Sequence, residues 1–174
     1  MVSIDELGAT VSPPEGQRPA VPWDEVEAML GSALPRDYKE LVETYGPGSF
    51  WGFIHVFQVD GQYPALDLVG QVSVNLDALK YLRDRGEVVP YDIEGDASLL
   101  SCGRTDNGDI IYWVRERSID PDDWVIAVNA ARDDRWFEYS GGITSFLSKV
   151  MTRALTVPVF PEALSGRRPS FQPY

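Results

Sequence analysis

The segment from residue 98 to residue 139 constrains the fold of this 174-residue chain more than any other. Apolar stretches follow one another there, separated only by short turn-forming sequences: Ser98–Cys102, Ile110–Val114, Trp124–Asn129 and Trp136–Tyr139. Asn107-Gly108 separates the first two, and this pair favours a tight hairpin because both central residues of such a turn accept positive φ. Strands joined by short turns pair antiparallel, since a parallel connection needs a long crossover. The segment therefore predicts an antiparallel meander.

Helical patterns lie on both sides of the meander. Apolar residues at helical spacing, with proline before and glycine after them, predict short helices over 23–31 and 35–46. A less regular pattern predicts a helix of about 12–15 residues ending at Gly86, and a last helix follows Gly141-Gly142. Apolar runs predict further strands over 50–57 and 66–69. We expect a single α+β domain, mainly an antiparallel sheet flanked by helices, with the helices on one side.

The two ends of the chain have less pattern. Residues 1–20 contain Ser12-Pro13-Pro14 and little periodicity, which indicates a loose leader. Residues 156–174 hold four prolines and indicate an extended, proline-rich tail, pinned by Val159, Phe160 or Leu164. The domain itself is then expected over residues 21–155.

The charge is strongly acidic, with a net value of -12 at neutral pH. Residues 1–100 carry -11 of it and residues 101–174 carry -1. Such a field repels nucleic acid and attracts basic proteins, although acidity also serves solubility alone. No secretory signal or membrane-spanning run is seen, and Cys102 is the only cysteine, so we expect a cytoplasmic protein without disulfides.

Signals for catalysis or ligand binding are weak. His55 and Cys102 could form a nucleophile and base pair, but neither an orienting third residue nor an oxyanion motif accompanies them. Gly46-Pro47-Gly48 lacks the Lys-Ser/Thr pair of a phosphate loop and is typical of a helix stop followed by a corner. The aspartates at 106–109, 120–123 and 133–134 lack the ligand spacing of a calcium loop and are typical of turns.

The order of several motifs resembles the SUKH superfamily of bacterial toxin-immunity proteins. The motifs are Trp23 with its short helix, Leu34-Pro35-Arg36-Asp37-Tyr38-Lys39-Glu40-Leu41, Tyr45-Gly46-Pro47-Gly48-Ser49-Phe50, Gly103-Arg104-Thr105-Asp106-Asn107-Gly108-Asp109 before Trp113, Asp122-Asp123-Trp124-Val125-Ile126, and Ser145-Phe146-Leu147. The resemblance covers residues 21–155. It implies a SUKH-like fold and a non-catalytic immunity protein that binds and neutralises a cognate toxin, without a cofactor or metal.

The resemblance and the charge together imply a basic protein partner, such as a nuclease or deaminase toxin, for a chain that is a monomer or weak homo-oligomer. Candidate partner contacts are the acidic residues of the first two helices and a tryptophan at a corner: Asp24, Glu25, Glu27, Asp37, Glu40, Glu43 and Trp51. Trp51, next to a glycine, is expected either to be partly exposed as an interface anchor or to cap the core. The alternatives are a regulatory interaction module without a toxin partner and, more remotely, a small hydrolase that uses His55 and Cys102.

Overall fold

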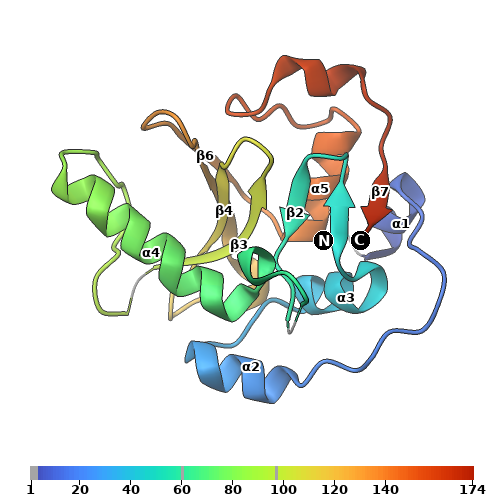
Figure 1. Cartoon of the computed structure of the whole chain (residues 1–174), viewed down its shortest axis with the longest axis horizontal. Coiled ribbons are helices and arrows are strands. Elements are labelled where there is room, and N and C mark those ends of the chain that lie inside the picture. The colour runs from blue at the N-terminus through green and yellow to red at the C-terminus, as the bar shows by residue number, and fades with distance from the viewer. Residues whose placement is uncertain (1–3, 60, 97) are drawn as a thin grey trace.

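The fold is a seven-stranded antiparallel sheet flanked by helices, a single α+β domain, as the sequence predicts (Figure 1). The computed structural model describes residues 4–59, 61–96 and 98–174. The sheet order is β6-β5-β4-β3-β2-β1-β7. The helices are α1 (Ile4–Thr10), α2 (Trp23–Leu30), α3 (Arg36–Tyr45), α4 (Leu68–Asp84) and α5 (Ile143–Met151). The strands are β1 (Gly48–Phe50), β2 (Ile54–Val56), β3 (Leu99–Thr105), β4 (Ile110–Val114), β5 (Val125–Asn129), β6 (Trp136–Tyr139) and β7 (Phe171–Pro173).

The predicted meander is confirmed, with β3, β4, β5 and β6 paired in sequence order. The hairpin between β3 and β4 differs in its turn, because Gly108 has positive φ (89°) and Asn107 does not. The Gly108 amide donates to Thr105 O at 3.0 Å, and the Thr105 amide donates to Asp109 O at 2.9 Å. The turn therefore needs one left-handed residue, which glycine supplies without steric cost.

The single strand predicted over 50–57 is wrong, because a turn divides it into β1 and β2. Trp51 (φ 60°) and Gly52 (φ 58°) both adopt left-handed conformations, and the Phe53 amide donates to Phe50 O at 3.1 Å. A tryptophan in this conformation is strained by about 1–3 kcal/mol and persists only where its surroundings hold it. Gly52 is the one turn signal in this apolar run, and a single glycine inside a strand pattern does not by itself predict that the strand is divided.

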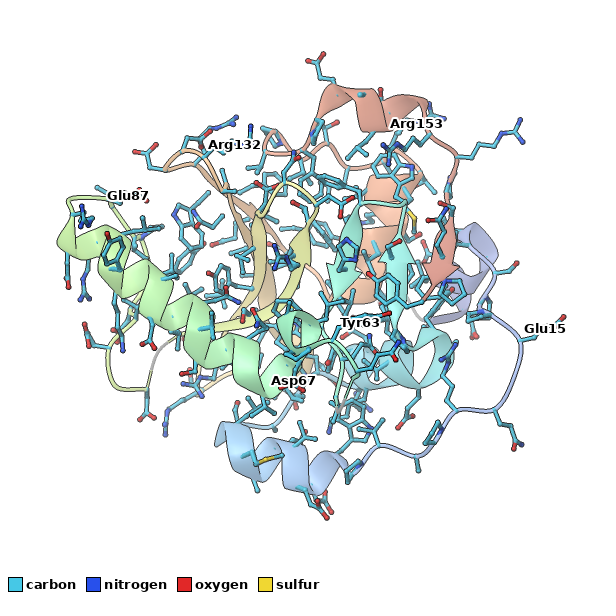
Figure 2. The ribbon with its side chains drawn as sticks, viewed as in Figure 1. Glu15, Tyr63, Asp67, Glu87, Arg132 and Arg153 are labelled. Carbon is cyan, nitrogen blue, oxygen red and sulfur yellow. The ribbon has the colours of Figure 1, made fainter. Side chains whose placement is uncertain are left out.

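The strand predicted over 66–69 is also wrong. Residues Pro64–Leu66 form a short 3-10 helix, η1, and α4 begins at Leu68 and has 17 residues, more than the roughly 12–15 predicted for this helix. Asp67, labelled in Figure 2, caps α4 by accepting a hydrogen bond from the Gly70 amide at 2.9 Å. The extended character of the segment is limited to an isolated parallel bridge between Gln58 and Asp67.

Helices cover both faces of the sheet, not one. The main core includes buried residues of α3 and α5 together with Leu100, Cys102 and Trp113 of the sheet. Leu79 of α4 instead packs with Leu99 and Tyr112, which precede Leu100 and Trp113 and therefore point to the opposite face. Figure 1 shows α4 beside β3 on one side of the sheet, with α5 behind the sheet.

The N-terminal segment is not a loose leader over the part that the structure describes. Residues Ile4–Thr10 form α1, and both Leu7 (0% exposed) and Val11 (6% exposed) belong to the main core. Tyr45 donates a hydrogen bond of 2.6 Å to Val11 O. The helix is too short to show a clear apolar period in the sequence, and its packing against the core stabilises it instead.

The C-terminal tail is part of the fold. Leu164 is buried, and Val159 and Phe160 pack against the core, so the three predicted pinning residues are confirmed. The tail is not simply extended: Glu162–Gly166 form a 3-10 helix, η3, and β7 then pairs antiparallel with β1. Residues 156–174 therefore supply one edge strand of the sheet.

Candidate partner-binding surface

Three of the six predicted acidic contacts are used inside the protein. Glu27 accepts the Leu34 amide at 2.8 Å and pairs with Lys39 at 2.5 Å. Glu43 accepts the indole N–H of Trp23 at 2.6 Å. These carboxylates connect α2 to α3, which reduces their availability to a partner.

Asp37, the third, connects α3 to α5. Its Oδ2 accepts hydrogen bonds from the amide and the hydroxyl of Thr144, at 3.0 and 3.1 Å, so it caps α5 from another helix. Burial raises the pKa of Asp37, and the bonds from Thr144 oppose that shift in part. The role of Asp37 in the fold is thus structural.

The other three acidic residues, Asp24, Glu25 and Glu40, are exposed. Within the described residues, none of these three carboxylates forms a hydrogen bond or an ion pair with another side chain. They are therefore able to meet a cationic partner. Asp24 and Glu25 begin α2, whereas Glu40 lies on α3 beside a groove.

The groove lies between α3, the 3-10 helix η2 (Pro121–Asp123) and the junction of β6 with α5. Its cavity volume is about 720 Å³. It is lined by Arg36, Asp37, Glu40, Asp122, Asp123, Trp124, Val125, Tyr139, Ser140, Gly141, Gly142, Ser145 and Lys149. We call this the acidic groove, because four carboxylates outnumber its two cationic side chains.

An ion pair between Arg36 and Asp122 lies in the lining of the groove. Arg36 contacts both carboxylate oxygens of Asp122, through its amide at 2.7 Å and its guanidinium at 2.5 Å. Partial burial acts to raise the pKa of Asp122, but the hydrogen bonds and charge of Arg36 outweigh it and lower that pKa. Arg36 therefore holds η2 against the first turn of α3.

In the part of the chain that the structure describes, the charged side chains of Glu40, Asp123 and Lys149 in the groove have no ion pair like that of Arg36 with Asp122. Lys149 lies over the ring of Tyr139, 5.5 Å from its centroid, and the Tyr139 hydroxyl bonds to Ser145 at 2.5 Å. Glu40 and Asp123 are exposed, and neither makes a side-chain hydrogen bond or ion pair among the residues the structure describes. The groove thus presents two free carboxylates beside an aromatic wall.

Sequence reasoning missed Asp122, Asp123 and Tyr139 as candidate contacts. The run of aspartates at 120–123 was a visible signal, but it also fits a turn, and Asp120 does accept the Asp122 amide at 3.0 Å. Only the packing of η2 against α3 brings Asp123 into the same groove as Glu40.

The predicted exposed anchor, Trp51, is wrong. Its side chain is 4% exposed, and its indole N–H donates to Arg167 O at 3.2 Å. The tail covers it, and the sequence pattern did not predict that packing. Trp51 is therefore not available as an interface residue.

His55 and Cys102 have separate environments. The ring nitrogens of His55 bond to the Tyr174 hydroxyl and, at 2.6 Å, to Asp106. Cys102 is fully buried in the main core, and burial raises the pKa of its thiol well above the usual value. A thiol in such surroundings is a poor nucleophile.

The comparisons with known proteins return no match: no family model, curated protein or solved structure is similar to this chain. Across the described residues, no helix is long and apolar enough to cross a membrane. The same part of the chain contains no group of three or more His, Cys, Asp or Glu side chains that could hold a metal ion.

Proposed function

We propose that the chain is a SUKH-like immunity protein, which binds a basic protein toxin and neutralises it without catalysis. The observation that carries the proposal is the acidic groove, where the free carboxylates of Glu40 and Asp123 line the same cavity as Tyr139. A concave acidic surface suits a protruding lysine or arginine of a partner through ionic contacts, and the ring of Tyr139, over which Lys149 lies, adds aromatic contact area.

The net charge adds a longer-range contribution. A protein of charge -12 attracts a basic partner before contact and increases the association rate. Asp24 and Glu25 contribute to this field from α2, outside the groove. We therefore expect the groove to set the lifetime of the complex and the overall field to set its association rate.

The first experiment is co-expression with the toxin encoded by the adjacent gene. We expect the chain to restore growth, and continued killing by a toxin that is expressed and active would contradict the proposal. The purified pair should also bind directly, with an association rate that falls as salt is raised, because ions screen the attraction.

The second experiment compares charge-matched variants. Glu40→Gln with Asp123→Asn removes two charges from the groove, and Asp24→Asn with Glu25→Gln removes two charges from α2. The groove variant should dissociate faster, by about tenfold for 1.4 kcal/mol, whereas the α2 variant should change mainly the association rate. Equal effects of the two variants on dissociation would exclude the groove as the contact site.

A further inference from the structure

The edge of the sheet away from the acidic groove carries a second candidate binding surface. There β1 pairs on its outer side with β7, in the register Gly48↔Pro173, Ser49↔Gln172 and Phe50↔Phe171. The sheet order places β7 at one edge and β6, beside the acidic groove, at the other. In Figure 1 the red β7 lies alongside β1.

The two strands of this pair differ in burial. All three residues of β1 are buried, whereas none of residues 165–174 is. The tail is anchored before that segment, where Val157 and Leu164 are buried. The edge of β1 is thus held in place by the core, whereas β7 is a more exposed strand that pairs with it.

Phe171 provides the side-chain contact. Its ring lies 5.2 Å from the ring of Tyr45 and 4.8 Å from that of Phe50, between centroids. Gly48 makes room for it, because a Cβ at Gly48 would lie 2.3 Å from Phe171 Cζ. We call this space the aromatic slot, formed by Tyr45, Gly48 and Phe50.

Backbone bonds extend the contact on both sides of Phe171. The Trp51 amide donates to Ser170 O at 2.8 Å, and the Tyr174 amide donates to Pro47 O at 3.2 Å. Such bonds accept any extended segment, while the slot selects an aromatic side chain. This combination is typical of sites where a peptide adds a strand to a sheet.

The charge of the tail indicates what kind of segment fits. Residues 152–174 contain three arginines and one glutamate, so the rest of the chain carries a net charge of -14. Arg167 donates to the carbonyl oxygens of Trp51 and Gly52, at 3.1 and 3.3 Å, beside the slot. The segment bound in the free protein is therefore basic and aromatic, on an acidic body.

We propose that the edge of β1 is a strand-accepting site, which β7 occupies in the free protein. A basic, extended segment of a partner protein, with an aromatic residue at the position of Phe171, binds there by replacing β7. The site lies away from the acidic groove, so the proposal does not depend on the partner being a toxin.

The test uses the chain of 174 residues and a fluorescent peptide with the sequence of residues 166–174, Gly-Arg-Arg-Pro-Ser-Phe-Gln-Pro-Tyr. In the wild type the tethered β7 competes at millimolar effective concentration, so the peptide binds weakly. In the Phe171→Ala variant the slot is open, and we expect binding to be tighter by about tenfold or more, measured by fluorescence anisotropy.

Three controls test where the peptide binds and what it requires. A peptide with Ala in place of Phe should lose the gain, and this control leaves the protein unchanged. Adding Gly48→Ala to Phe171→Ala should also abolish binding, because the new Cβ fills the slot. Replacing both peptide arginines with glutamine should weaken binding, because the body of the protein is acidic.

Three results would overturn the proposal. The first is equal peptide binding by the wild type and Phe171→Ala. The second is binding that ignores the loss of Phe from the peptide. The third is a concentration-dependent wild-type dimer that the peptide dissociates, because the occupant would then be a second copy of this chain and not a partner protein.

Discussion

The contact between Asp37 and Gly142 gives the sharpest test of how the groove is built. Asp37 Oδ2 caps α5 through Thr144, and Gly142 leaves the space for that oxygen. A Cβ at Gly142 would lie 2.3 Å from Asp37 Oδ2. Gly142 has φ -75°, so alanine fits the backbone there and the substitution acts on the carboxylate alone.

The expected cost follows from the two hydrogen bonds. Loss of a cap side chain typically costs about 0.5–2 kcal/mol, and a net hydrogen bond to a charged group contributes about 1.5–3 kcal/mol. Since burial of the carboxylate offsets part of that gain, we expect Asp37→Ala and Gly142→Ala each to lower the free energy of unfolding by about 1–2 kcal/mol. Urea denaturation with linear extrapolation measures both values.

The double variant should lose little more than either single variant. Once Asp37 is alanine, the Cβ at position 142 no longer meets a carboxylate, so the two costs are not additive. Gly8→Ala is the control, because Gly8 lies inside α1 and a Cβ added there would meet no atom within 4 Å. That change should stabilise the protein by about 0.5–1 kcal/mol.

The pH dependence has a defined sign. The folded-state pKa of Asp37 is raised above the ordinary 3.8, so the folded protein binds this proton more tightly than the unfolded chain does. Its contribution to stability therefore increases as the pH falls from neutral through the folded-state pKa towards 3.8. The stability difference between wild type and Asp37→Ala should widen on acidification. A narrowing difference, or additive costs of the two single variants, would refute the reasoning.

Two further predictions concern segments whose packing the sequence does not show. Leu7→Ala should lower the free energy of unfolding by about 2–5 kcal/mol, because Leu7 is 0% exposed in the main core. Urea denaturation measures this change. A decrease below about 0.5 kcal/mol, typical of surface sites, would show that the N-terminal segment does not pack on the core. Cys102 should react with a thiol reagent at pH 8 only after unfolding, since burial raises the pKa of its thiol; rapid labelling of the native protein, followed by absorbance, would contradict its place in the core.

The residues of the acidic groove could be predicted from the sequence only in part. Glu40 was predicted as a candidate contact and is exposed beside the groove. The same helix carries Asp37, which looks equivalent in the sequence but caps α5 across 107 residues of chain. Charge and helical position do not distinguish the two, because the difference arises from a helix that follows much later.

The meander, the helix of residues 36–45 and the acidic charge follow from the sequence by itself, because turn chemistry and apolar periodicity are local properties. The turn at Trp51, the placement of α4 on the second face and the addition of β7 to the sheet were decided by tertiary structure. Each depends on packing between segments far apart in the chain, as where Arg167 and Ser170 bond to Trp51. Such contacts leave no apolar period or motif in the sequence, because they form only between segments that the folded core brings together.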